Sequence, residues 1–356
     1  MYEGLYKLDN YSYDLPAALI AQEPASPRDS SRLLVVNRSS QSFEETIFRD
    51  IVSFFKAGDV MVLNNTEVIK ARLKGVTQSG SKIDVLLLRE KEKGVWEVLM
   101  KPGKRCRAAA AAGKDIIFDS EKLKARIIDT TEAGTRILRF EPADIEKLLP
   151  ELGDVPLPPY IKKRLQDPRD YQTIYASKKG AVAAPTAGFH FTSDLLDKLK
   201  SKGVEMAWLT LHCGLPTFRP VKTDDIRDHR IDCEWIDISP SVSQTINSAK
   251  QQKRRVIAVG TTTVRALESA AIVDARGEAA LRPIQTHTNL YLVPGYTFKI
   301  VDALITNFHT PCSTNLILVA AFCGLELTKR CYSYAKERNF RFFSFGDAMF
   351  IYGYLL

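Results

Sequence analysis

The chain has 356 residues, of which 45% are hydrophobic and 26% charged, and no part of it is of low complexity. This composition excludes a disordered or fibrous protein, and the length predicts two domains, because single cores rarely exceed about 250–300 residues. The formal net charge of +8 favours a polyanionic partner, although it would equally serve the solubility of an ordinary enzyme.

Three features bear on the compartment. The first residues, MYEGLYKLDN, include acidic side chains and no apolar core, so we expect no secretion signal. The longest apolar stretch, LILVAAFCGL at residues 316–325, is about half as long as a membrane span. The six cysteines lack the spacing of a zinc site, which is typical of reduced thiols. We therefore expect a cytoplasmic protein without a membrane segment or a metal site.

The first 150 residues contain two kinds of pattern. In residues 11–63, the apolar runs LLVV and VMVL predict short buried strands. Residues 66–150 contain short alternating segments such as KIDVLLL, VWEVLM and RILRF, which are typical of a small antiparallel β-barrel or sandwich. This region has 18 Lys and Arg against 13 Asp and Glu, a net charge of +5. Its surface could therefore face RNA, or it could simply be a solvated barrel exterior.

After the stiff connector PLPPYI at residues 156–161, patterns of helix length and strand length alternate. TSDLLDKLKSKG and SPSVSQTINSAKQQKRR predict helices, whereas VEMAWLTLH, VIAVG and VDALITNFH predict strands. Such alternation is typical of an α/β domain with mostly parallel strands. We therefore predict the α/β fold class, with a barrel-like main domain of residues 1–65 and 151–356 and an antiparallel β-barrel domain inserted at residues 66–150.

Polar residues follow the ends of three predicted strands. His212 ends VEMAWLTLH, Gly260 and Thr261 follow VIAV, and Asn307 and His309 end VDALITNFH. The carboxyl ends of parallel strands meet at one edge of a sheet, where ligands bind in α/β folds. The sequence therefore predicts one pocket at this edge, although a histidine after a strand can also be purely structural.

The segment VGTTTVRALES suggests an anion site. Its threonines, Thr261 and Thr262 among them, can begin a helix whose free N–H groups favour a carboxylate or phosphate. Arg265 could add a bidentate contact, and Glu268 lies one turn further along the same helix. A strand followed by Gly, Thr and a helix also serves as a plain structural turn.

Two further histidines lie in unusual surroundings. His190 ends AVAAPTAGFH, where small residues would let the backbone approach a ligand, or would simply pack tightly. His229 lies in DDIRDHRIDCE, where nearby carboxylates should raise its pKa and suit proton transfer, unless this is a solvated acidic turn. The five carboxylates are Asp224, Asp225, Asp228, Asp232 and Glu234.

Three common motifs are absent from the sequence. No G-x-G-x-x-G follows a strand, which disfavours a dinucleotide site or a standard methyltransferase site. No G-x-x-x-x-G-K-[ST] is present, so ATP is not implied, and no G-x-S-x-G indicates a nucleophilic serine.

Taken together, the chain resembles the bacterial S-adenosylmethionine:tRNA ribosyltransferase-isomerase family of the queuosine pathway. The resemblance runs in order from about residue 11 to 351. It rests on YDLPAALIAQEP, RDSSRLLVVNR, GDVMVLNNTEVIKARL, PLPPYI, YQTIYA, GAVAAPTAGFHFT, GVEMAWLTLHCG, TFRPV, RRVIAVGTTTVRALESAA, VDALITNFHTPCST and RFFSFGDAMFI.

The resemblance implies a reaction and an inventory of site residues. The family moves the ribosyl part of S-adenosylmethionine onto the aminomethyl group of a 7-deazaguanine at the tRNA wobble position and isomerises it, forming epoxyqueuosine. No metal or other cofactor is implied, and we expect a monomer. Our hypothesis gives acid/base roles to His212, His229 and His309. The same hypothesis assigns substrate binding to His190, Thr261, Thr262, Arg265, Glu268 and Asn307.

Three positions depart from the family pattern. Glu67 replaces an Arg, Pro216 replaces a Gly, and Asp232 replaces a second His. Glu67 cannot make an arginine's contacts, Pro216 restricts its turn, and Asp232 removes an acid/base partner. The departures motivate a second hypothesis, a catalytically weakened RNA-binding relative. A methyltransferase that uses the same donor is a third, which the missing glycine motif disfavours.

Overall fold

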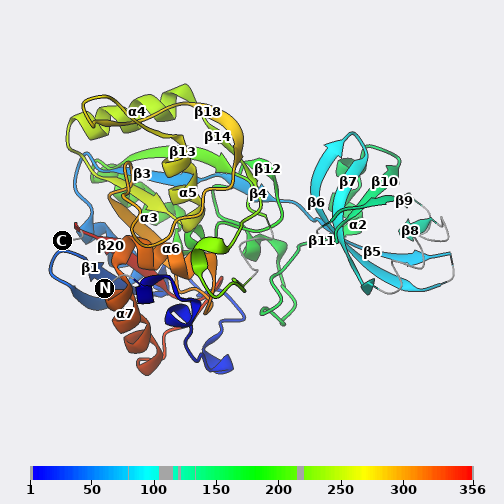
Figure 1. The fold of residues 1–356 in the computed structure, drawn as a ribbon, viewed down its shortest axis with the longest axis horizontal. Helices are drawn as coiled ribbons and strands as arrows, with labels where there is room; N and C mark the ends of the chain where they lie inside the picture. Colours follow the sequence, from blue (N-terminus) through cyan, green and yellow to red (C-terminus); the bar gives the residue numbers. More distant parts are fainter. Residues whose placement is uncertain are drawn as a thin grey trace. The chain divides into compact units, whose positions relative to one another are not determined.

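The computed structural model describes residues 3–78, 80–103, 115–118, 122–132, 134–214 and 220–354. The chain forms two compact units (Figure 1). Unit 1 comprises Met1–Glu67, Pro159–Lys178 and Ala184–Leu356, and unit 2 comprises Val68–Pro158 and Lys179–Ala183. Unit 2 is therefore longer than the insert predicted at residues 66–150. One reason is that the amide of Ile69 donates to the carbonyl of Ala181 (3.0 Å), which brings a second stretch of chain into the unit.

Unit 2 is an antiparallel β-barrel, as predicted. Neighbouring strands pair in the order β11-β5-β6-β7-β10-β9-β8, and pairing of β5 with β8 closes six of them into a ring. The pattern of alternate buried residues, as in Ile83, Val85 and Leu87, directs one face of each strand inward. The bounds are β5 Arg72–Thr77, β6 Lys82–Glu92, β7 Val95–Lys101, β8 Ile116–Phe118, β9 Leu123–Thr130, β10 Arg136–Glu141, α2 Leu149–Leu152 and β11 Gly153–Asp154.

Unit 1 contains a nine-stranded sheet, in the order β18-β14-β13-β3-β15-β19-β20-β1-β2. The central strands β13, β3, β15 and β19 are parallel to one another, as the sequence predicted, and β1 is parallel to β20; the remaining neighbours are antiparallel. The barrel-like form predicted for this domain is wrong, because the sheet is mixed and no pairing between β18 and β2 closes it in the described residues. The bounds are β1 Arg32–Asn37, β2 Ser42–Ile47, β3 Val60–Asn64, β13 Glu205–Leu211, β14 Glu234–Ile238, β15 Val256–Val259, β18 Ile284–Thr288, β19 Ala303–Asn307 and β20 Ala348–Tyr352.

Helices cover both faces of this sheet, so its central strands are apolar on both sides. The α-helices are α3 Ser193–Ser201, α4 Pro240–Gln251, α5 Thr261–Ala270, α6 Thr314–Cys323 and α7 Leu325–Glu337. The short 3-10 helices include η5 Phe48–Phe54, η8 Thr186–His190 and η10 Ile226–Asp228. The short strands outside the two large sheets are β4 Thr66–Val68, β12 Lys178–Ala181, β16 Ala271–Val273 and β17 Ala279–Leu281.

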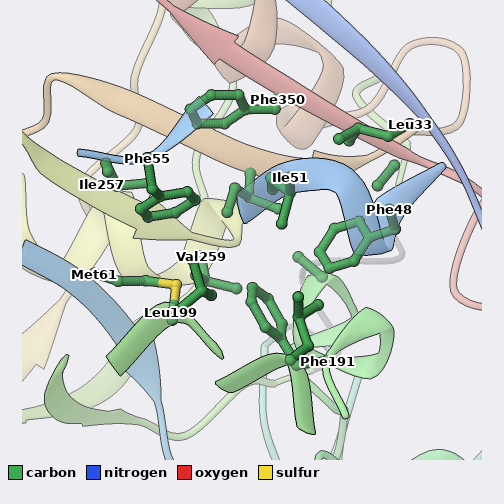
Figure 2. Packing of buried hydrophobic residues seen from close by; sticks show 14 of the residues in the cluster. Leu33, Phe48, Ile51, Phe55, Met61, Phe191, Leu199, Ile257, Val259 and Phe350 are labelled. Carbon is green, nitrogen blue, oxygen red and sulfur yellow. The ribbon is translucent and has the colours of Figure 1, made fainter. Parts of the chain in front are cut away.

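One face of the sheet carries the main hydrophobic cluster (Figure 2). Alternate strand residues such as Met61, Val259 and Phe350 point to this face, where η5 and α3 cover them. Phe55 stacks on Phe350 with ring centroids 5.9 Å apart, and Phe48 meets Phe191 edge to face at 5.1 Å. Because the core fixes these strands, it also fixes where their carboxyl ends lie.

The apolar stretch noted at residues 316–325 mostly lies in α6, whose residues from Leu316 to Cys323 are all buried. A helix that is apolar on every side is typical of a protein core. Among the described residues, no helix combines the length and the apolarity that a bilayer span requires.

Candidate active site

Unit 1 has a recess at the carboxyl ends of its parallel strands. It encloses about 730 Å³, a volume that includes space open to solvent. Thr261, Thr262, Asn307 and His309 all line it. The structure therefore brings the predicted ends of β15 and β19 together, because these two strands run parallel as neighbours.

Helix α5 begins at the wall of this recess. The strand β15 ends at Val259, and Gly260 then takes φ 92°, a left-handed conformation that suits glycine. This turn points the first residues of α5, Thr261 and Thr262, into the recess. The amide groups of a first helical turn have no acceptor within their own helix, so they are available to a ligand.

Helix α6 begins at the same recess. Ser313 caps it, accepting from the amide of Leu316 at 3.2 Å, and Ser313 and Asn315 both line the recess. The Thr261 hydroxyl donates to Oδ1 of Asn315 at 3.0 Å, which ties the starts of α5 and α6 together. Two helix N-termini at one site create a positive potential without any charged side chain, and such a site favours a carboxylate or phosphate.

His309, which follows β19, also lines the recess. Its Nε2 lies 2.8 Å from the hydroxyl oxygen of Thr306, and its amide donates to the Tyr332 hydroxyl at 3.0 Å. Although the residue is partly accessible, burial of the ring lowers the pKa of His309 to about 3. The imidazole is therefore neutral at physiological pH and can accept a proton or a hydrogen bond.

The described lining of the recess contains neither Asp and Glu nor Lys and Arg. Its ionisable side chains are Tyr160, Cys213 and His309. Burial raises the pKa of the Tyr160 phenol and of the Cys213 thiol, so both are protonated near neutral pH. Among these three groups, His309 is thus the one that can take up a proton.

The end of β3 joins the other strand ends through Asn64, which is fully buried. Its Oδ1 accepts from the amides of Thr66 (3.1 Å) and Leu211 (3.0 Å). Its Nδ2 donates to the Leu211 carbonyl at 2.9 Å and to the Thr262 hydroxyl at 3.4 Å. Asn64 thereby holds the ends of β3 and β13 against the start of α5.

Comparisons with known proteins agree with this arrangement. A family model described as "Queuosine biosynthesis protein" matches residues 8–351. Two similar proteins are from Halothermothrix orenii and Clostridioides difficile, 47% and 45% identical over 347 residues that cover 97% of this chain and 99% of each relative. Both are named S-adenosylmethionine:tRNA ribosyltransferase-isomerase. The chain belongs to this family.

A solved structure agrees as well. The crystal structure of S-adenosylmethionine tRNA ribosyltransferase from Thermotoga maritima is 37% identical and covers 96% of this chain and 99% of its own, with a TM-score of 0.53. The resemblance seen in the sequence is therefore confirmed, and the protein is an enzyme of the ribosyltransferase-isomerase family.

The other two proposed acid/base histidines of this family member lie outside the recess. His212 follows β13, but its Nδ1 lies 2.8 Å from the Thr66 hydroxyl oxygen and its ring stacks on Trp235 at 4.9 Å. It is the next residue, Cys213, that lines the recess. This follows from the alternation of side chains along an extended chain.

His229 follows η10, with its ring edge-on to Tyr291 at 5.6 Å. The prediction that nearby carboxylates raise its pKa is wrong. Burial lowers the pKa of His229, and Asp232 opposes this only partly. Two of the five carboxylates are engaged elsewhere: Asp225 binds Arg227, and Glu234 binds Arg265.

His190 does not line the recess but contacts a residue that does. It is buried between the Ser31 hydroxyl oxygen, 2.7 Å from Nδ1, and the Asn307 amide nitrogen, 3.1 Å from Nε2. Burial lowers its pKa to about 3. Asn307 Nδ2 also donates to the Phe343 carbonyl at 3.2 Å, and its Oδ1 accepts from Thr186 at 3.1 Å. The neutral ring thus helps to hold the Asn307 amide in one orientation.

Arg265 and Glu268 of α5 are also held by protein groups. Arg265 forms a buried ion pair with Glu234, donates from Nε to the Leu290 carbonyl at 3.0 Å, and leaves its Nη2 unpaired in the described structure. Glu268 accepts three backbone amides, from Lys299, Ile300 and Val301. The structure does not bring either residue to the recess wall.

Several lining residues were missing from the prediction, namely Tyr160, Thr186, Thr306, Asn315 and Ser344, whereas Cys213 and Ser313 follow the predicted strand ends but had no assigned role. Asn64 was missed too, yet it follows the apolar run VMVL as His212 follows its own strand. The expectation that polar residues at the carboxyl ends of parallel strands line one pocket, applied also to this fourth strand, would have identified Asn64. Tyr160 and Ser344 come from loops, so the strand ends do not indicate them, although both lie in strings of the family resemblance, PLPPYI and RFFSFGDAMFI.

The departures from the family pattern lie in different places. Glu67 is a partly buried residue of β4, and Asp232 lies near His229. Pro216 lies outside the described residues.

No group of three or more His, Cys, Asp or Glu within the described ranges is arranged to hold a metal ion. The five described cysteines, Cys213, Cys233, Cys312, Cys323 and Cys331, are free thiols.

Proposed function

We propose that this enzyme transfers the ribosyl moiety of S-adenosylmethionine to the 7-aminomethyl-7-deazaguanine at the wobble position of tRNA and isomerises it. The product is epoxyqueuosine in tRNA, and adenine and methionine are released. The observation that supports this most is a neutral, hydroxyl-rich recess in which two helix N-termini meet one unprotonated histidine. The names of the relatives, S-adenosylmethionine:tRNA ribosyltransferase-isomerase, support the donor, the tRNA acceptor and the transfer with isomerisation.

The chemistry makes four demands on the recess. The sulfonium charge acidifies the adjacent ribose 5′ carbon, so a base must remove that proton. Adenine needs a proton as it leaves, and the aminomethyl nitrogen must be neutral to attack. The methionine carboxylate needs a site that favours an anion.

We assign the base to His309. If Thr306 accepts from Nε2–H, the lone pair of the ring lies on Nδ1, and that atom takes the proton. Burial lowers the pKa of His309, so the ring is unprotonated before the reaction, and the same lowering makes it a weaker base than a free imidazole. Thr306, held in β19, then fixes the tautomer and the orientation of the ring.

We assign the methionine carboxylate to the joined starts of α5 and α6. The first amides of both helices meet there beside the Thr261 hydroxyl, whose proton goes to Asn315, so the carboxylate would gain amide hydrogen bonds and a favourable potential. Thr262 and Asn307, on neighbouring parts of the wall, would contact the ribose or adenine. His190 would act through Asn307, whereas Arg265 and Glu268 would act by holding α5 in place.

The test is to incubate the enzyme with labelled S-adenosylmethionine and tRNA carrying the aminomethyl base. Release of adenine and methionine is expected; S-adenosylhomocysteine would instead indicate a methyltransferase, and binding without products a weakened relative. His309→Ala should slow adenine release by roughly 10²–10⁴-fold, the usual contribution of a general base. His212→Ala and His229→Ala, outside the recess, should cost far less, and near-normal turnover of His309→Ala would remove His309 from the mechanism.

The compartment, the oligomeric state and the cofactor requirement of the enzyme are also part of the proposal. We propose a cytoplasmic monomer that needs no metal or other cofactor, because the sulfonium itself activates the carbon and provides the leaving group. Activity in excess chelator should equal that in buffer, and the enzyme should elute at the size of one 39.9 kDa chain. Loss of activity with chelator, or a larger particle, would contradict these parts alone.

A further inference from the structure

Three consecutive cations follow a residue of the recess wall. Tyr160 lines the recess, and Lys162, Lys163 and Arg164 come two to four residues later. All three cations are exposed. Four residues of extended chain span at most about 14 Å, so these charges lie close to the recess.

The backbone of this segment is held in place. The side chain of Gln22 accepts from the Lys162 amide at 2.8 Å and donates to the Tyr160 carbonyl at 3.0 Å. The Tyr160 hydroxyl lies 2.8 Å from the Ser344 hydroxyl oxygen, and its ring packs on Phe343 at 4.7 Å. The cations are therefore presented from a fixed position.

A fourth cation is anchored at another part of the wall. The amide of Val221 donates to the Cys312 carbonyl at 2.8 Å, and Pro220 pairs with Ser313, which lines the recess. The next residue, Lys222, is exposed. Two separate segments thus place positive charge next to the same recess.

The charges of this group are largely unneutralised. Lys163 pairs with Glu23 at 2.5 Å, but Lys162, Arg164 and Lys222 have no carboxylate partner in the described parts of the chain. In unit 2, by contrast, many described cations are matched by carboxylates. Examples are Arg72 with Asp84, Lys74 with Asp154, Arg89 with Glu97, Lys93 with Asp144, Lys122 with Glu151 and Arg126 with Asp115.

We propose that Lys162, Lys163, Arg164 and Lys222 bind the phosphates of the RNA strand that delivers its base into the recess. This inference rests on the proposed function, in which the substrate is a base within RNA. The recess itself is uncharged, so it suits the base and the nucleoside but not the backbone phosphates. The phosphates must stay in solvent beside it, where exposed unpaired cations can replace condensed counterions.

The test is the variant Lys162→Ala/Lys163→Ala/Arg164→Ala, measured for tRNA binding at several salt concentrations. The matched control is Lys198→Ala/Lys200→Ala/Lys202→Ala. These three exposed lysines lie on and just after α3, which leads into the amino end of β13, the sheet edge opposite the recess. Both variants lose three positive charges, so any difference in their tRNA binding is due to where the charges lie and not to the net charge of the protein.

The recess variant should weaken tRNA binding about 10-fold or more and lower the magnitude of the salt slope by about 2, at roughly 0.7 per lost single-strand phosphate contact. The loss should appear in KM for tRNA more than in kcat. The control should keep the salt slope of the wild type. Lys222→Ala should reduce the slope by a further increment of about 0.7.

Two results would be informative in different ways. If the recess variant and the control have the same affinity and slope while wild type releases adenine, the phosphates lie elsewhere and this inference is wrong. If wild type binds tRNA yet forms no products, the proposed function fails, and the affinities and salt slopes of the two variants still decide for or against the binding surface.

Discussion

The first turn of α5 and the two turns that follow it have different tasks within one sequence motif. Thr261 and Thr262 line the recess, where the free amides of this first turn are available to a ligand and the two hydroxyls contact the Asn315 and Asn64 side chains. Arg265 and Glu268 are equally buried, but their charges are bound to Glu234 and to three backbone amides. Burial of a polar residue therefore does not by itself indicate a ligand contact; what decides is whether protein groups already satisfy it.

The largest effect is expected for Glu268→Ala. It would leave three amides without acceptors, of which those of Ile300 and Val301 are buried, at roughly 1–3 kcal/mol for each buried amide. Denaturant unfolding should show the loss. Glu268→Gln, which keeps one acceptor oxygen, should lose less, and Glu326→Ala, exposed on α7, should lose under about 1 kcal/mol. An unchanged unfolding midpoint for Glu268→Ala would contradict the structural role.

Arg265→Ala should come next, with a loss of about 3–5 kcal/mol of unfolding free energy, because it leaves the Glu234 carboxylate buried and unpaired. The double variant Arg265→Met/Glu234→Leu should recover much of this loss. If instead Arg265 binds substrate directly, Arg265→Ala will remain stable while KM for S-adenosylmethionine rises. That result would contradict the structural role assigned to Arg265.

A third effect concerns pH. His190 and His309 have pKa values of about 3 in the folded state against an ordinary 6.5, so only the unfolded chain binds their protons between these values. Stability should therefore fall as pH drops below about 6.5, by about 1.4 kcal/mol per histidine per pH unit, until about pH 3. At pH 5 this amounts to roughly 2 kcal/mol for each ring.

His190→Gln provides the control for this pH effect. Gln can still accept from the Asn307 amide, yet it does not titrate, so the slope of unfolding free energy against pH should fall by the contribution of one histidine, about 1.4 kcal/mol per pH unit. A slope identical to that of wild type would mean that His190 is protonated in the folded protein.

The smallest effect separates two threonines of the same turn. Thr261→Val removes a hydroxyl from the recess wall and should raise KM for S-adenosylmethionine about 10-fold, the equivalent of one hydrogen bond. Thr263→Val is the matched control, because the Thr263 hydroxyl is fully buried and donates to the Val259 carbonyl. It should cost about 1 kcal/mol of stability and leave KM unchanged; the opposite pattern would reverse the assignment.

Much of the architecture could be predicted because it depends on local patterns. Apolar strands alternating with helices indicated a parallel sheet, and its central strands β13, β3, β15 and β19 are parallel. Short alternating segments indicated the antiparallel barrel, which β5 and β8 close. Polar residues at the carboxyl ends of the strands were also predicted correctly to share one recess, as Thr261, Asn307 and His309 do, because neighbouring parallel strands end at the same edge of the sheet.

The functions of individual polar residues could not be predicted in the same way. Glu234 seemed to be one of five carboxylates around His229, yet it pairs with Arg265, which follows it by 31 positions in the chain. His212 and Cys213 are neighbours, and only the direction of each side chain decides which one reaches the recess.

The sequence by itself determined the elements, their order, the family and the strand ends at which polar residues gather, because these depend on periodicity and on residues close in the chain. Only the tertiary structure decided which polar groups already have partners. That choice depends on contacts such as Asn307 with His190 and Asn64 with Thr262, between residues that are distant in sequence and meet when the sheet closes over its core.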